Sequence, residues 1–102
     1  MDKREVIEKL VAYKHLLSEH IDLDKLVLYG SYARGNPHKD SDIDVAVIVK
    51  KVDGDHFEFA SRLWELGIEI DARIEPMLFE EDREDYSGFL ETILKEGIEI
   101  KD

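Results

Sequence analysis

Two aspartates separated by one residue, Asp42 and Asp44, are the residues of this chain best suited to chemistry. In an extended strand, residues i and i+2 project from the same face, so the two carboxylates would point the same way from backbone positions roughly 6–7 Å apart. Such a pair could bridge two metal ions lying about 3.5–4 Å apart, the separation found in two-metal phosphoryl-transfer sites. Because converged carboxylates without a cation raise one another's pKa and destabilise the fold, this pattern favours a bound metal.

The ligand types available indicate which metal this would be. The chain has no cysteine, and none of its four histidines is obviously placed as a ligand, so hard oxygen donors favour Mg²⁺, with Mn²⁺ as an alternative, over zinc. A third ligand is expected from residues 68–74, where apolar and polar residues alternate as in a strand. Asp71 lies on the polar face of that predicted strand and is the natural choice. Glu69 and Glu75 share this face by parity and stay open as alternatives.

A Gly-Ser pair precedes the aspartates and could hold phosphate. Gly30 allows the backbone to approach a ligand closely, and Ser31 begins a predicted helical turn whose free N–H groups favour an anion. Arg34, one turn later, could reach a phosphate or pair with a carboxylate, and the sequence favours neither role. His38 and Lys39 are expected to be ordinary loop residues, although Lys39 could assist with a triphosphate. A phosphate-binding turn beside a carboxylate pair indicates metal-dependent chemistry on a nucleotide.

Three familiar ligand-binding motifs are excluded at specific positions. Gly30 and Gly35 have the glycine spacing of a P-loop, but Asn36-Pro37 stand where Lys-Ser/Thr are required. Aspartates at 40, 42 and 44 copy the first ligands of an EF-hand, yet Val45 replaces its glycine and Lys51 its bidentate glutamate. No glycine pattern of a dinucleotide-binding fold is present.

The elements that must position these residues alternate between helix and strand. The patterns predict a helix over 4–19, a strand over 25–29, a helical turn over 32–34 closed by Gly35, and a central strand over 43–49 buried on both faces. A helix over 57–66, ended by Gly67, is expected to pack with Phe57 and Trp64 among its core residues. The strand over 68–74 should end at Pro76, and a helix from Phe89 to Gly97 and an edge strand over 98–100 should follow. The fold class is therefore α/β (α+β), with one mixed sheet flanked by helices.

Composition narrows the class of protein. The chain has 102 residues, enough for one domain spanning 1–102, and 43% hydrophobic and 38% charged residues are typical of a globular protein. A formal charge of −11 repels the phosphate backbone, which argues against free DNA or RNA as the main partner. We expect a cytoplasmic protein, because neither a membrane span nor a signal peptide is recognisable and cysteine is absent.

The motif Gly30-Ser31-Tyr32-Ala33-Arg34-Gly35, followed after five residues by Ser41-Asp42-Ile43-Asp44-Val45, resembles the signature of the DNA polymerase β-like nucleotidyltransferase superfamily. The small size resembles the minimal nucleotidyltransferases, which often act as antitoxins beside HEPN-domain proteins. The resemblance implies that Asp42, Asp44 and Asp71 bind the metals and that Gly30 and Ser31 hold the triphosphate.

The leading hypothesis is therefore transfer of a nucleoside monophosphate, AMP from ATP, to an acceptor hydroxyl with release of pyrophosphate. Two Mg²⁺ ions would assist, and the acceptor would arrive on another macromolecule, a HEPN-type protein being the plausible one, or a second subunit would complete the site. Asp71 would orient the attacking oxygen. The alternative is a binding module, an antitoxin that neutralises its partner by contact alone; a metal-stabilised structural domain is the third possibility.

Overall fold

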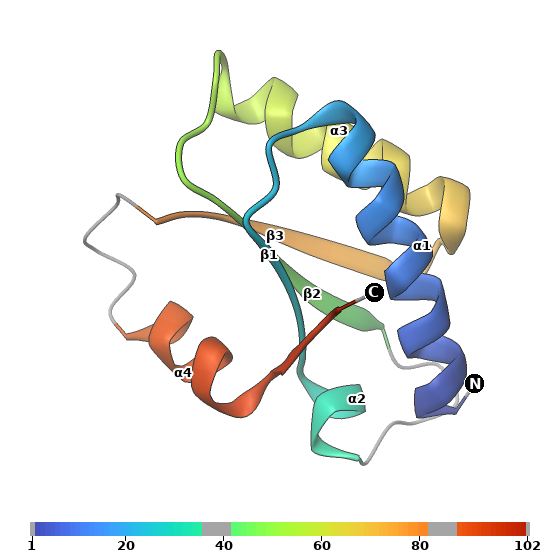
Figure 1. Cartoon of the computed structure of the whole chain (residues 1–102). Helices are drawn as coiled ribbons and strands as arrows, with labels where there is room; N and C mark the ends of the chain where they lie inside the picture. The colour runs from blue at the N-terminus through green and yellow to red at the C-terminus, as the bar shows by residue number, and fades with distance from the viewer. Residues whose placement is uncertain (1, 36–41, 82–87, 102) are drawn as a thin grey trace.

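A four-stranded sheet forms the centre of the molecule, as a computed structural model of the chain shows (Figure 1). The structure describes residues 2–35, 42–81 and 88–101. Its elements follow the predicted order: α1 (Lys3–His20), β1 (Lys25–Tyr29), α2 (Ser31–Arg34), β2 (Ile43–Val49), α3 (His56–Ile70), β3 (Ile74–Glu80), α4 (Phe89–Glu96) and β4 (Ile98–Glu99). The predictions for His38 and Lys39 fall outside the described residues.

The strands lie in the order β3-β2-β1-β4. β1 runs antiparallel to both β2 and β4, whereas β2 and β3 are parallel and are joined by the crossover through α3. β2 is therefore a central strand, and all of its residues except Asp44 are buried, which confirms the prediction from its β-branched composition.

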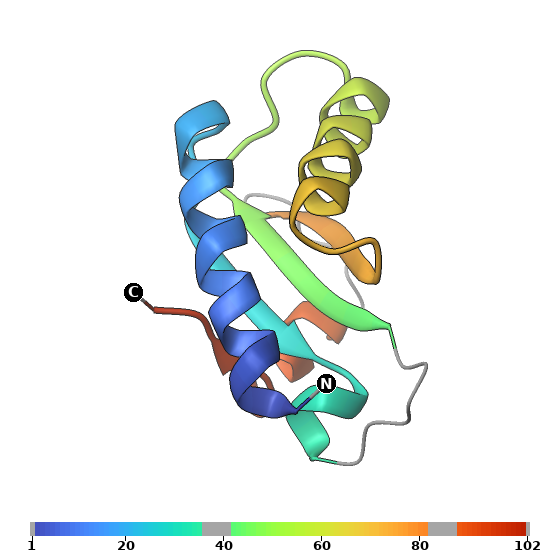
Figure 2. The same ribbon diagram turned by 90° about the vertical axis from the view of Figure 1, so that its right-hand side faces the viewer.

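Helices cover the two faces of this sheet unequally. α1 and α3 lie side by side on one face, and α4 lies on the other (Figures 1 and 2). The larger core lies beneath α1 and α3 and includes Leu10, Tyr13 and Leu63 packed with Val45 and Val47. The smaller core, beneath α4, contains Val27, Ala46, Ile48, Phe79 and Ile93. The face beneath α4 thus has a smaller apolar cover, and polar groups of the strands can remain accessible there.

The first helix forms where the sequence predicts it. The side chain of Asp2 caps α1 by accepting a hydrogen bond from the Glu5 backbone N–H at 2.9 Å. The apolar stripe of this helix, Val6, Leu10, Tyr13 and Leu17, is buried. The hydroxyl of Tyr13 donates a 2.8 Å hydrogen bond to the Leu63 carbonyl, which ties α1 to α3.

The boundary between α3 and β3 differs from the prediction. α3 does not stop at Gly67 but continues to Ile70, so residues 68–70 are helical, and β3 begins only at Ile74. Gly67 is buried inside the helix, where a Cβ would lie 3.3 Å from the Ile74 Cγ2 and 3.7 Å from the Tyr13 ring. The glycine thus permits close packing rather than ending the helix. Pro76 lies within β3, which tolerates it because β3 is an edge strand.

The predicted packing of two aromatic residues of α3 is also wrong. Phe57 is 81% exposed and Trp64 is 41% exposed, because the core side of the helix is formed by Leu63, Leu66 and Gly67 instead.

In the parts of the chain that the structure describes, no helix has the length and apolar character needed to cross a membrane.

Candidate nucleotide and metal site

The Gly-Ser turn joins β1 to a single helical turn. Gly30 ends the strand with φ of +77°, a backbone conformation that disfavours any residue with a Cβ. α2 then runs from Ser31 to Arg34, and Gly35, in the left-handed conformation, closes it with its N–H directed to the Ser31 and Tyr32 carbonyls. The first N–H groups of this turn have no partner within the helix and are suited to bind an anion.

Three carboxylates come together beside this turn. Asp42 lies just before β2 and is exposed, and Asp44 follows two residues later on the strand. The strand register places Asp44 opposite Tyr29 of β1 on one side and opposite Glu75 of β3 on the other. Because opposite residues in neighbouring strands share a face, Asp44 and Glu75 both project from the face that α4 covers in part. The third carboxylate is therefore Glu75.

Gly30 and Asp44 fit against each other. A Cβ placed on Gly30 would overlap the carboxylate of Asp44, whose Cγ would lie at 3.2 Å from it. The Gly30-Ser31 turn and the Asp44 carboxylate thus lie directly against each other, and glycine is required at position 30 for steric as well as conformational reasons.

The electrostatics of the three carboxylates are those of an incompletely neutralised cluster. Burial raises the pKa of Asp44, and the charge of Asp42 adds to the rise, while hydrogen bonding to Glu75 and the charge of Arg34 oppose it. Burial likewise raises the pKa of Glu75, with further contributions from the charges of Asp42 and Asp44 and from hydrogen bonds with both. A divalent cation bound beside these carboxyls would favour their ionised forms.

The donor set is suited to Mg²⁺, although the side chains are not arranged around a cation. Among the residues that the structure describes, no three His, Cys, Asp or Glu side chains form a ready-made metal site. Carboxylate oxygens are nevertheless the protein ligands that Mg²⁺ takes, and a cation would oppose both the burial and the charge of Asp42 that raise the pKa values of Asp44 and Glu75. Asp42, Asp44 and Glu75 would be the ligands.

Asp71 lies elsewhere, and the prediction that it sits on a strand beside Asp44 is wrong. It is the C-cap residue of α3, and its carboxylate accepts hydrogen bonds from Lys9 Nζ at 2.9 Å and from Arg73 Nη2 at 2.9 Å and Nε at 3.1 Å. The guanidinium of Arg73 and the ammonium of Lys9 hold the pKa of this nearly buried carboxyl well below its usual range. Because Lys9 belongs to α1, Asp71 faces the layer of α1 and α3, not the partly open face of the sheet. Its contacts are those of a structural ion pair.

The sequence contains one signal for Glu75, although it does not decide between Glu75 and Asp71. The apolar run from Met77 to Phe79 indicates that the strand continues beyond Pro76. The isoleucines at 68 and 70 extended the apparent alternation backwards, although in the structure they are the last turn of α3. Glu69, the other alternative, lies on α3 and is exposed.

A cavity adjoins the Gly-Ser turn. It has a volume of about 380 Å³ and lies between α2 and α4, with Gly30, Tyr29, Arg34 and Phe89 among its lining residues. The Tyr29 and Phe89 rings meet edge to face with centroids 6.0 Å apart. Arg34 is exposed, and its charge acts on Asp44, so one guanidinium lies within reach of both the carboxylates and this cavity.

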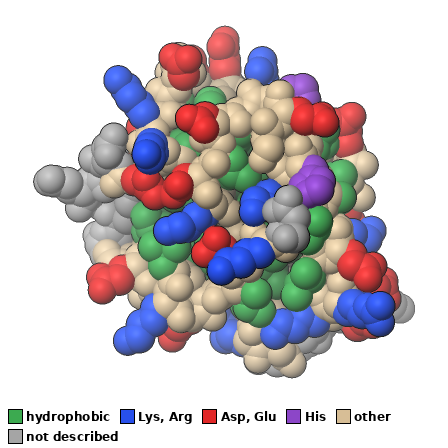
Figure 3. All heavy atoms as spheres, viewed as in Figure 1, with side chains coloured by type: hydrophobic (Ala, Val, Ile, Leu, Met, Phe, Trp, Pro, Cys, Tyr) green, Lys and Arg blue, Asp and Glu red, His purple; other side chains and the backbone are tan. Residues whose placement is uncertain are grey.

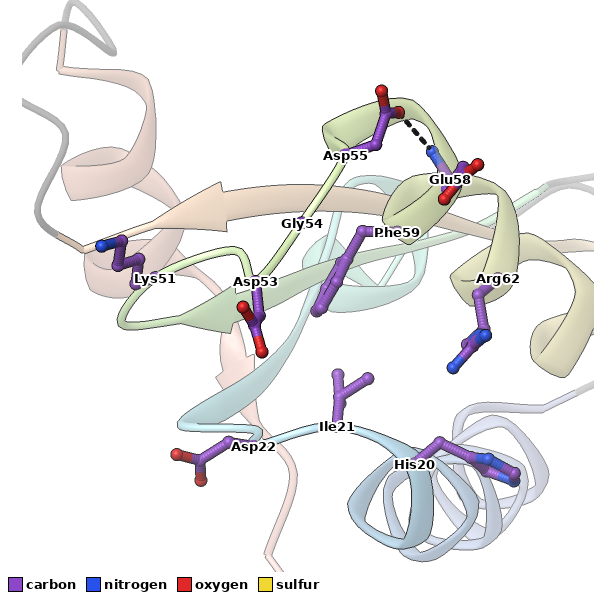
Figure 4. Close-up of a pocket in the computed structure, with 10 residues that line it drawn as sticks. All are labelled: His20, Ile21, Asp22, Lys51, Asp53, Gly54, Asp55, Glu58, Phe59 and Arg62. Carbon is purple, nitrogen blue, oxygen red and sulfur yellow. Dashed lines mark hydrogen bonds between the residues drawn. The ribbon is translucent and has the colours of Figure 1, made fainter.

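A second cavity, of about 350 Å³, lies at the opposite end of β2 (Figure 4). Phe59 and Ile21 form its apolar centre (Figure 4). Around them lie Arg62 from the middle of α3, Asp53 from the segment after β2 and Asp22 from the segment after α1. Its lining includes neither the Gly-Ser turn nor any of the three carboxylates. The chemistry suggested by the sequence therefore lies at the cavity beside Gly30, not here.

The chain is similar in sequence to known proteins. Residues 12–102 match the family described as "Polymerase beta, Nucleotidyltransferase". The chain is also 29% identical over 103 residues to a protein of Methanocaldococcus jannaschii, with 94% of this chain and 99% of that protein covered. The name of that relative, provisional in its own wording, is protein adenylyltransferase. The chain belongs to the polymerase β nucleotidyltransferase family.

Proposed function

We propose that this protein transfers AMP from ATP to a hydroxyl group of another protein, using Mg²⁺ held by Asp42, Asp44 and Glu75. The strand register that sets Asp44 beside Glu75, next to the Gly30 turn, is the observation that carries the proposal. Family membership supports nucleotidyl transfer in general, and the name of the M. jannaschii relative supports AMP and a protein acceptor.

Different residues have different roles in the proposed reaction. The backbone N–H groups at Ser31 and the guanidinium of Arg34 bind the triphosphate, and the cavity lined by Tyr29 and Phe89 receives the nucleoside. The acceptor oxygen forms a bond to the α-phosphorus while the bond from that phosphorus to the bridging oxygen breaks, and pyrophosphate leaves. Glu75 is placed to orient the acceptor hydroxyl and to accept its proton. Bound Mg²⁺ supplies charge neutralisation for the phosphates and lowers the pKa of the hydroxyl.

The protein acceptor is proposed from the name of the M. jannaschii relative and from the family resemblance. The family resemblance suggests a HEPN-type protein and an antitoxin role, and both belong to the proposal. The alternative, a contact antitoxin without catalysis, is favoured by one observation, the large apolar side chains exposed on α3.

The test is transfer of label from α-labelled ATP to the candidate partner protein in the presence of Mg²⁺. The wild type should label the partner, and Asp42→Asn, Asp44→Asn and Glu75→Gln should each lower the rate by about 10²-fold or more, as expected when a group that stabilises the transition state is lost. Asp71→Asn is the matched control. At a temperature where it is folded, it should retain the rate.

Two outcomes would contradict the proposal. Loss of labelling in Asp71→Asn with full retention in Glu75→Gln would restore Asp71 as the third ligand. Stable association without any labelling, together with no ATP-dependent rise in melting temperature, would favour the contact antitoxin.

A further inference from the structure

One face of α3 carries large apolar side chains that the fold does not bury. Phe57 is 81% exposed, Trp64 is 41% exposed and Ile68 is 60% exposed. These residues are seven and four positions apart, and at 3.6 residues per turn they fall on one line along the helix. The apolar stripe, as we call Phe57, Trp64 and Ile68, therefore extends over most of the length of α3.

The core does not need these side chains. α3 packs onto the sheet through Leu63, Leu66 and Gly67, which are all buried. Large apolar side chains grouped on an exposed helix face are typical of a surface that binds another molecule.

A row of acidic side chains follows the same line. Glu58, Glu65 and Glu69 each come directly after one residue of the stripe, so the acidic row runs parallel to it about 100° further round the helix. All three glutamates are exposed. The exposed Arg62 lies on the same side of the helix, so this border carries three negative charges and one positive charge. An apolar stripe bordered by a net negative charge favours a partner of positive charge.

Charge argues against a second copy of this chain as that partner. The formal net charge is −11. A two-fold axis relating two antiparallel α3 helices would also set both acidic rows along the same side of the contact, where they repel each other.

We propose that the apolar stripe of α3 is the docking site for an amphipathic helix whose apolar face is flanked by lysine or arginine. This inference does not depend on the proposed nucleotidyl transfer, because none of the residues of the stripe or of the acidic row belongs to the candidate site.

The chain contains its own reporter for the test, because Trp64 is its single tryptophan. The probe is a synthetic helical peptide with a leucine stripe flanked by a row of lysines. Its addition should shift the Trp64 emission to shorter wavelength as the indole leaves water. Two control peptides, one with the lysines replaced by glutamates and one with the same composition in scrambled order, should cause no shift.

Variants of the protein locate the binding. Phe57→Asp and Ile68→Asp should each weaken binding of the basic peptide by about tenfold or more, as expected for loss of an interface anchor. The control Leu94→Asp changes a side chain that is 46% exposed on α4 and should leave the affinity unchanged.

Replacing Glu58, Glu65 and Glu69 together by Gln should weaken binding of the basic peptide and reduce the salt dependence of that binding. Replacing Glu19, Glu91 and Glu99 by Gln alters the net charge equally and should have a smaller effect.

Four results would overturn the inference. They are equal binding of the lysine and glutamate peptides, no emission shift with the lysine peptide, equal weakening by Leu94→Asp, and a wild-type dimer in sedimentation velocity that Phe57→Asp dissociates. The last would assign the stripe to self-association instead.

Discussion

The pKa values of carboxyl groups in this protein are shifted in opposite directions at two places. The pKa values of Asp44 and Glu75 are raised, first because burial disfavours their charged forms and second because the negative charge of Asp42 acts on both. The pKa of Asp71 is lowered, because Arg73 and Lys9 donate hydrogen bonds to it. An ion pair stabilises a fold, whereas a cluster of like charges costs stability and is retained where a ligand will neutralise it. This contrast in pKa distinguishes Asp71, in an ion pair, from the carboxylates of the candidate site.

Replacing Asp44 by Asn is predicted to stabilise the protein at neutral pH while abolishing transfer. A carboxyl whose folded-state pKa lies above its unfolded value of about 3.9 destabilises the charged folded state, and this cost disappears as the pH falls through the raised pKa. Asp44→Asn should therefore melt a few degrees above the wild type at pH 7 without metal, and the difference should shrink in acid. Thermal melts across a pH series measure this.

Asp53→Asn is the control for that experiment, because it removes the same charge from an exposed position. An equal rise in both variants would mean that general relief of negative charge, not the carboxylate cluster, is responsible.

Replacing Asp71 by Asn is predicted to destabilise the fold by about 1–2 kcal/mol, a value reduced for screening because the side chains of Lys9 and Arg73 are more than one-third exposed. The folded-state pKa is lowered, so the stabilisation is present above the ordinary Asp pKa of about 3.9 and is lost as the pH falls through the folded value. Urea unfolding at pH 7 and in acid measures both effects.

Glu8→Gln is the control for this prediction. It breaks the exposed Arg4–Glu8 pair and should change the free energy of unfolding by less than about 0.5 kcal/mol. Equal losses in the two variants would contradict the structural role of Asp71.

At the scale of elements, the short α2 turn depends on a glycine at each end. Gly30 and Gly35 both have positive φ, but only Gly30 lies against a side chain of the candidate site, the Asp44 carboxylate. The turn therefore sets the position of the N–H groups proposed to bind phosphate relative to β2.

Gly30→Ala is predicted to cost about 1–3 kcal/mol for the backbone conformation, plus the displacement of Asp44 by the new Cβ. Gly54→Ala is the matched control, because Gly54 also has a positive φ, +89°, and an added Cβ there would meet no atom of the described residues within 4 Å. Both variants should lose stability in urea unfolding, but only Gly30→Ala should lose ATP binding. Retention of ATP binding in Gly30→Ala would remove the turn from the site.

At the scale of the whole molecule, the face drawn in Figure 3 has acidic and basic side chains interspersed, with hydrophobic ones between them. Yet the formal charge is −11, so any divalent cation is attracted without a specific site. A rise in melting temperature with Mg²⁺ alone is therefore weak evidence for a specific metal site. Melting temperatures with and without Mg²⁺ must be compared at the same ionic strength.

Mg²⁺ with ATP is predicted to raise the melting temperature of the wild type above that in NaCl of equal ionic strength, because a ligand that binds only the folded state stabilises it. The double variant Asp42→Asn, Asp44→Asn should lose this rise. Differential scanning calorimetry measures it. A rise of equal size in the double variant would show that the cation is held by the general negative charge.

The sequence by itself determined most of the fold. The strands over Lys25–Tyr29 and Ile43–Val49 were predicted with the bounds that the structure has, because apolar runs of strand length bounded by Gly, Lys and loop residues allow little else. The helices α1, α2 and α4 followed from caps, apolar periodicity and stop residues in the same way. The Gly30-Ser31 turn and the Asp42, Asp44 pair are local in the chain, so their relation could be foreseen.

Only the tertiary structure decided the rest. Whether Asp71 or Glu75 stands beside Asp44 depends on where α3 ends and how β3 aligns with β2, and local alternation of residues cannot distinguish a last helical turn from a first strand residue. The same is true of Phe57 and Trp64, whose apolar character predicts burial while the packing of α3 on the sheet leaves them exposed. Register and packing are relations between segments distant in the chain, and they place Glu75 in the candidate site and Asp71 in an ion pair outside it.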